Sequence, residues 1–244
     1  MCALPRLTSL AVVVLMSIAC GLSEARESTS GSADNPVEID GEPLHSIRLV
    51  NSVIRVYEAQ IPVGSRTLFH AHRHGGAGID MTATRLSIEK VGETSNEEIS
   101  TKAGDIFPLN LSMPFVHRVV NLGTEAYRVV VAELLQAPDV SARASTVAGT
   151  RNYKLELETD RVLAYRLTLH PGEATTTHTL RAQTLIVSVS GGQLSVSAPG
   201  QANRLVSLAP GALEWNSDPF TITIRNLGVS DYESVYFEWK PATR

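Results

Sequence analysis

The chain repeats itself, and this internal repeat constrains its fold more than any other feature of the sequence. Over the later part of each copy the offset is 105 residues, pairing Phe115, Asn121-Leu122-Gly123, Tyr127 and Glu133 with Phe220, Asn226-Leu227-Gly228, Tyr232 and Glu238. Over the earlier part it is 108 residues, pairing Gly64, His70 and Gly92 with Gly172, His178 and Gly200. Residues matched at a nearly constant spacing in this way are the signature of a duplicated structural unit. The 244 residues therefore predict two tandem copies of one fold.

Each copy consists of short β-rich runs separated by Gly, Pro and Asn. Residues 221–225 alternate strictly, and Val235, Phe237 and Trp239 share one face of the last run. Residues 129–135 are almost continuously apolar, which is typical of a strand that is buried on both faces or of a very apolar edge strand. Patterns with a helical period are scarce. The sequence predicts an all-β protein with little helix, built as sandwiches or barrels.

Two histidine motifs give the repeat a family resemblance. Gly64-x5-His70-x-His72, followed by His117-x3-Asn121, resembles the two conserved motifs of the cupin superfamily. The resemblance implies two tandem cupin-like barrels, each a double-stranded β-helix or jelly roll. We place barrel 1 at residues 46–136, a linker at 137–149 and barrel 2 at 150–241.

The two copies depart from the family pattern to different degrees. In barrel 1, Gly76 occupies the position where the family has a glutamate ligand. In barrel 2 only His178 remains, and Leu180, Thr184 and Ile222 occupy the other ligand positions. The resemblance therefore implies a metal site in barrel 1 and a degenerate barrel 2 that keeps the shape without the site.

The histidines of barrel 1 are the candidate metal ligands. Residues i and i+2 of a strand point to the same face, so Arg66, His70 and His72 are expected to line the interior. His117 would join them from a later strand. Three neutral imidazoles suit a divalent ion such as Fe, Zn, Mn, Ni or Cu. His74 continues the series, either as a fourth ligand or as a residue of the barrel mouth.

A site with three neutral ligands has a chemical consequence. The charge of a divalent ion stays uncompensated, which favours a small anionic molecule in the open positions. Arg66 could pair with that anion, or could be a solvated rim residue. Three-histidine cupin sites resemble those of several iron-dependent dioxygenases, so the resemblance implies a metal-dependent oxygenase as the catalytic hypothesis. His45 and His170 lie outside the motifs, and the sequence gives them no role.

The N-terminus resembles an export signal. Arg6 is followed by the uncharged run 7–19, which is too short to span a bilayer and fits the core of a signal peptide. One interpretation is a signal peptide over residues 1–25. A second is a lipoprotein signal that ends before Cys20, which would carry the lipid, and a third is an uncleaved anchor. We expect an exported protein, in the periplasm, secreted or held at the outer surface, with residues 26–45 as a flexible linker.

Composition excludes several other classes. With 21 basic and 25 acidic side chains the formal charge is −4, and no basic run or aromatic-rich patch supports nucleic-acid binding. Contact with a membrane is expected only through the N-terminal lipid. The rival functional hypothesis is a non-catalytic module that binds a small ligand or has a structural role, and a homodimer through sheet edges is also expected. The sequence does not decide whether the protein is an enzyme.

Overall fold

The computed structural model describes residues 31–109, 114–137 and 145–240, and most of them lie in strands. Two short 3₁₀ helices are η1 (Ile39–Gly41) and η2 (Val147–Gly149). No helix in these residues has the length and apolar character needed to cross a membrane. The strands of the first half are β1 (Val37–Glu38), β2 (His45–Val50), β3 (Ile54–Ile61), β4 (His70–His72), β5 (Gly76–Asp80), β6 (Arg85–Lys90), β7 (Glu97–Ser100), β8 (Ile106–Leu109), β9 (Phe115–Asn121) and β10 (Tyr127–Leu134). Those of the second half are β11 (Tyr153–Glu158), β12 (Val162–Leu169), β13 (His178–Leu180), β14 (Thr184–Ser188), β15 (Gly192–Ser197), β16 (Arg204–Leu208), β17 (Leu213–Asn216), β18 (Phe220–Asn226) and β19 (Tyr232–Trp239).

The strands form two barrels whose strand orders match except for β1, which has no counterpart among the described strands of barrel 2, and this confirms the tandem β-barrel prediction. Barrel 1 consists of the sheets β1-β4-β9-β6-β7 and β2-β3-β10-β5-β8. Barrel 2 consists of the sheets β13-β18-β15-β16 and β11-β12-β19-β14-β17. The registers also correspond, since His70 pairs with His117 across β4 and β9, as His178 pairs with Ile222 across β13 and β18.

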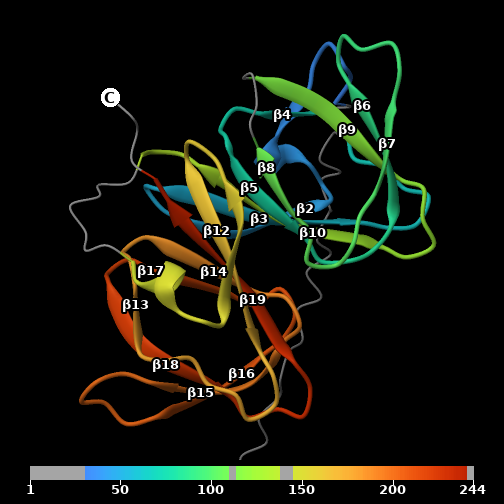
Figure 1. Cartoon of the computed structure of the whole chain (residues 1–244). Coiled ribbons are helices and arrows are strands. Elements are labelled where there is room, and N and C mark those ends of the chain that lie inside the picture. Colours follow the sequence, from blue (N-terminus) through green and yellow to red (C-terminus); the bar gives the residue numbers. More distant parts are fainter. Residues whose placement is uncertain (1–30, 110–113, 138–144, 241–244) are drawn as a thin grey trace, which may run out of the picture.

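The two barrels pack against each other through the sheets that contain β10 and β19 (Figure 1). Successive residues of a strand point to opposite faces, so β10 and β19 each present one face to a barrel interior and one to the other barrel. On β19, Val235, Phe237 and Trp239 form the outward row and are at most 1% exposed. They share one core with residues of β3, β5 and β10 from barrel 1. The prediction that residues 129–135 are buried on both faces is therefore confirmed for Val129 to Leu134.

The prediction of a flexible linker up to residue 45 is wrong for its described part. Val37 of β1 pairs in parallel with His70 of β4, and Ile39 is fully buried in the interior core of barrel 1. The buried carboxylate of Glu42 accepts hydrogen bonds from the backbone N–H groups of Leu44 and Leu68. These contacts join the segment to the barrel, although its composition is that of a polar spacer.

The linker predicted at 137–149 does not match the structure over residues 145–149, because Val147 of η2 is fully buried in the core of barrel 2. The predicted signal peptide and Cys20 lie outside the described residues.

Candidate metal centre

Strands β4 and β9 bring the three predicted histidines together inside barrel 1. The β4–β9 register places His70 opposite His117 and His72 opposite Phe115. One ring nitrogen from each of the three histidines lies within 4.8 Å of the other two. The two motifs, 45 residues apart in the chain, thus meet at one point of the barrel interior.

Hydrogen bonds at Nδ1 fix the ring orientations of His70 and His72. His70 Nδ1 donates to the Leu68 carbonyl oxygen over 3.0 Å, and His72 Nδ1 donates to Glu133 Oε1 over 3.1 Å. With the proton on Nδ1, the lone pair that remains for a metal is on Nε2.

The ring separations suit a metal centre. His72 Nε2 and His117 Nε2 lie 3.0 Å apart. Two nitrogen ligands about 2.0–2.2 Å from one ion, at an angle near 90–110°, lie about 3.0–3.5 Å apart. The observed spacing therefore fits an edge of a coordination polyhedron.

Burial keeps two of the three imidazoles in the form that binds metal. Desolvation, followed by the neighbouring histidines, holds the pKa of His70 and of His117 well below the usual value. Both rings are therefore neutral at pH 7, with a free lone pair for a cation. A donor set of three imidazoles fits a divalent transition metal.

Glu133 supports the centre, and the sequence reasoning did not assign it a role. Its side chain is fully buried, and Arg55 donates to its Oε2 from Nε at 2.9 Å and from Nη2 at 2.6 Å. Burial opposes its ionisation, but the hydrogen bonds from His72 and Arg55 outweigh burial and lower the pKa of Glu133. The ionised carboxylate and the ring of His72 form a carboxylate–histidine pair of the kind that orients metal ligands.

Barrel 2 lacks the hydrogen-bonded series formed by Arg55, Glu133 and His72 in barrel 1. By the same register, Leu163 replaces the arginine and Leu180 replaces the histidine, while Glu238 keeps the glutamate position. Glu238 is 1% exposed, and its Oε1 has no hydrogen-bond partner among the described residues. Desolvation raises its pKa. The arginine and histidine partners thus occur together only in the barrel that has the three histidines.

Gly76 cannot be replaced by the family glutamate without rearrangement. A Cβ at this position would overlap the carbonyl oxygen of Ala132 on the neighbouring strand β10. The close approach of β5 and β10 therefore requires glycine here, and the first coordination sphere has no carboxylate at this position.

The three histidines line a cavity of about 420 Å³ in the barrel interior. Phe115 and Val119 line it with His117, as their shared strand face predicts. His45 also lines it, with its ring centroid 4.9 Å from that of His70. Burial lowers the pKa of His45 to about 4, so this ring is neutral as well. Nothing in the sequence marks His45 as a site residue, because it belongs to neither motif and reaches the site through β2.

Arg66 and His74 are not brought into this group. Arg66 is exposed and does not line the cavity, whereas the buried Thr67 does. The expected inward position of Arg66 is wrong because the chain has no regular strand alternation before β4 begins at His70. His74 lies in the bend between β4 and β5, half-buried and outside the three-histidine group. A role for Arg66 in ligand binding has no geometric support.

No family model matches the sequence. A search of curated proteins also finds no match. Solved structures do resemble the chain. Oxalate decarboxylase from Lactobacillus farciminis has a TM-score of 0.54 and 9% identity, over 79% of this chain and 78% of its own. Salicylate 1,2-dioxygenase from Pseudoaminobacter salicylatoxidans has a TM-score of 0.50 and 9% identity, over 76% and 71%. AerE from Microcystis aeruginosa has a TM-score of 0.52 and 12% identity, over 82% and 98%.

These likenesses, with the topology, define the class of fold. A cupin 2 conserved barrel domain protein from Leptotrichia buccalis has a TM-score of 0.50 and 7% identity, over 80% of this chain and 88% of its own. The chain thus has the tandem-barrel cupin fold predicted from the repeat and the histidine motifs. Within it, barrel 1 contains a three-histidine group that could hold a metal ion, and the residues described for barrel 2 contain no such group.

Proposed function

We propose that barrel 1 holds one divalent metal ion through His70, His72 and His117 and uses it to bind and transform a small anionic molecule. The observation that carries the proposal is the convergence of the three ring nitrogens, two of them from rings oriented by Nδ1 hydrogen bonds. A bound ion would supply Lewis-acid attraction for an anion and, if it is redox-active iron, a route for oxygenation.

The charges around the site leave the attraction for an anion to a bound ion. The three imidazoles bring no negative charge, and Glu133 is paired with Arg55. Lys90 lines the same cavity but pairs with Glu97 over 2.8 Å, and Asp80 and Asp105 line it as well. The positive charge that would attract an anion would therefore come from a divalent ion, whose charge three neutral ligands leave uncompensated.

The apolar walls define the size and character of the ligand. The cavity volume of about 420 Å³ lies within the range of small-molecule sites. Tyr57, Phe107 and Val131 are among its walls, and they exclude water from the ligand's body. A compact anion with an apolar part fits a cavity with a metal site and apolar walls better than a fully polar anion does.

Ligand binding and oxygen uptake by the metal-loaded protein test the proposal. Protein loaded with Fe²⁺, Mn²⁺, Ni²⁺ or Zn²⁺ would be titrated with small carboxylates, diketones and thiols, with dioxygen consumption recorded for each. The proposal predicts metal-dependent binding of an anion, and oxygen uptake with the iron form. Metal-dependent binding with no turnover of any compound would favour the non-catalytic module, and absence of any metal-dependent ligand would contradict the proposal.

We further propose that the protein is exported, as the run at 7–19 and its flanks suggest. Fractionation of cells that express the full chain tests this. A Cys20→Ala variant that leaves the membrane fraction would favour lipid anchoring, and an entirely cytoplasmic wild type would contradict export.

A further inference from the structure

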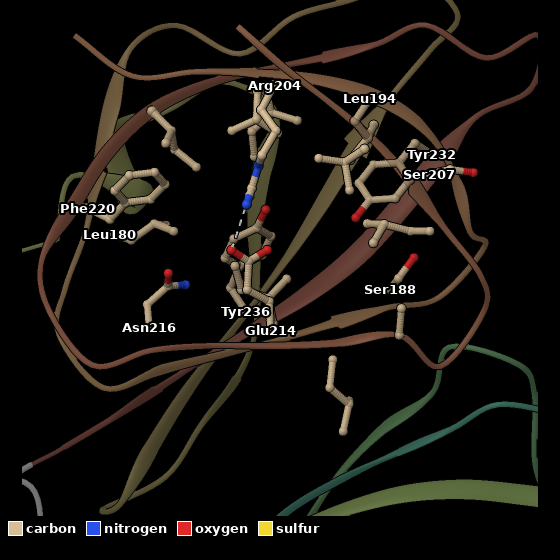
Figure 2. Close-up of a pocket in the computed structure, with 18 of the residues that line it drawn as sticks. Leu180, Ser188, Leu194, Arg204, Ser207, Glu214, Asn216, Phe220, Tyr232 and Tyr236 are labelled. Carbon is tan, nitrogen blue, oxygen red and sulfur yellow. Dashed lines mark ion pairs between the residues drawn. The ribbon is translucent and has the colours of Figure 1, made fainter. Parts of the chain in front are cut away.

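Barrel 2 encloses a cavity of its own, of about 520 Å³ (Figure 2). This volume lies within the range of small-molecule sites. The cavity is distinct from the metal centre, because its lining residues all belong to barrel 2. Most of the walls are aliphatic or aromatic, among them Leu180, Ile186, Leu194, Val196, Phe220 and Ile224.

The duplication shows how this interior became apolar. Leu180 and Ile222 occupy the positions of His72 and His117, and both are buried in the cavity wall. The remaining histidine, His178, has both ring nitrogens in hydrogen bonds, with the Tyr153 hydroxyl at 2.9 Å and the Thr176 carbonyl oxygen at 2.9 Å. It has no free lone pair to offer an ion, so the cavity has the shape of its neighbour without the attraction for a metal.

The cavity lining carries no net charge. Arg204 and Glu214 are its charged residues, and they pair with each other over 3.6 Å (dashed in Figure 2). Burial raises the pKa of Tyr232 and of Tyr236, so both phenols are neutral at pH 7. An anion or cation entering this space would lose its hydration without gaining a counter-charge.

Two polar groups of the wall, Ser188 Oγ and Asn216 Nδ2, have no hydrogen-bond partner among the described residues. Asn216 lines the cavity from β17, and its Nδ2 is buried without a hydrogen-bond partner among the described residues (Figure 2). An amide N–H donor in this situation gains from a ligand oxygen that can accept. Leu205, which also lines the cavity, is 75% exposed and marks an apolar edge where the cavity meets solvent.

We propose that barrel 2 is a second ligand site, which takes a neutral, largely apolar small molecule with one acceptor oxygen, such as a ketone or an ester. The apolar wall holds the body of the ligand, and Asn216 donates to its oxygen. This site is independent of the metal in barrel 1, so the protein binds two chemically different ligands in two barrels of one fold.

A displacement assay on the full chain tests the proposal. The neutral fluorophore N-phenyl-1-naphthylamine would be displaced by butyrophenone, by butylbenzene, which lacks the oxygen, and by 4-phenylbutyrate, which is anionic. We expect butyrophenone to bind best, butylbenzene about fivefold more weakly because it lacks one hydrogen bond, and 4-phenylbutyrate not to compete. The assay would be run without added metal and with a chelator, to separate it from the site of barrel 1.

Matched variants assign the site. Val196→Trp fills the cavity of barrel 2 and should abolish displacement, whereas Ile88→Trp at the equivalent position of barrel 1 should leave it unchanged. Asn216→Ala should remove the preference for butyrophenone over butylbenzene. If Val196→Trp does not fold, the ratio of the affinities for butyrophenone and butylbenzene in Asn216→Ala tests the proposal by itself. Loss of binding in Ile88→Trp but not in Val196→Trp, preference for 4-phenylbutyrate, or an unchanged ratio in Asn216→Ala would overturn the proposal.

Discussion

His72 donates from Nδ1 to Glu133 Oε1 over 3.1 Å, and this hydrogen bond joins the candidate metal centre to a buried carboxylate on β10. Glu133 is fully buried, and its second oxygen is held by Arg55. In barrel 2 the glutamate position persists while both partners are leucines. This hydrogen bond is therefore, with the three histidines, a feature that distinguishes barrel 1 from barrel 2.

Glu133→Gln tests this support of His72. Glutamine keeps the volume and can still accept a hydrogen bond, but it removes the charge that raises the basicity of the ring. We expect metal affinity to fall about 10- to 100-fold, as for other changes to the partner of a metal-bound histidine. Competition with a chelator measures it. Glu238→Gln, the same change in barrel 2, is the control and should leave the affinity unchanged.

Arg55→Leu gives barrel 1 the residue that barrel 2 has. The buried carboxylate of Glu133 then loses both guanidinium hydrogen bonds, and we expect the free energy of unfolding to fall by about 3 kcal/mol. Arg73→Leu is the control, because its pair with Glu38 is similar in geometry but exposed, and it should cost far less stability than Arg55→Leu. Denaturant unfolding of both variants measures the difference, and equal losses would contradict the account.

Gly76→Glu restores the glutamate of the family motif, yet we expect it to damage the protein. The new Cβ would overlap the Ala132 carbonyl oxygen, so β5 must move away from β10. The predicted result is a loss of several kcal/mol in stability or no soluble protein, since overpacking of this kind typically costs about 1–3 kcal/mol or more. A stable variant with tighter metal binding would show that the backbone yields and that the position still accepts a ligand.

Asp80 predicts a pH dependence of stability. Desolvation raises its pKa to about 6, more than the hydrogen bond from the Tyr127 hydroxyl lowers it. The folded state thus binds this proton more tightly than the unfolded state, whose carboxyl titrates near 3.8. Its contribution to stability is full below pH 4 and is lost as the pH rises to 6, by about 3 kcal/mol.

Asp80→Asn should remove this slope, so the difference in unfolding free energy between wild type and variant should change between pH 4 and 6 and level off above. Asp231→Asn, which changes an exposed carboxylate, is the control. A wild type and an Asp80→Asn variant with parallel stability curves would show that the carboxyl titrates normally.

The sequence predicts the fold and the three histidines because both depend on local patterns. The period-two alternation of β19 and the spacing of His70 and His72 are visible in single segments, and the repeat shows that the segments occur twice. Arg66 was misplaced because the alternation was extended beyond the first residue of β4. His45 and Arg55 could not be found, since their positions at the site depend on the registers of β2 and β10 with β3.

The sequence indicates the position of Glu133 but not its role. The repeat marks its position through the match with Glu238, but a matched glutamate alone does not reveal a partner. Its role follows only once β3 and β10 are paired, which places Arg55 opposite it, and once β4 brings His72 to its other oxygen. The difference between the three-histidine barrel and its copy therefore becomes visible when the paired strands of the two barrels are compared, rather than the two segments of sequence.

The central claim is that His70, His72 and His117 bind one metal ion together, and an equilibrium metal titration tests it most directly. Chelator-treated wild type and His117→Ala would be titrated with Fe²⁺, Mn²⁺, Ni²⁺ and Zn²⁺, with His170→Ala, an exposed histidine of barrel 2, as the control. The account predicts one tightly bound ion per chain in the wild type and the control, and none in His117→Ala. Equal metal content in the wild type and His117→Ala, whether zero or one, would contradict it.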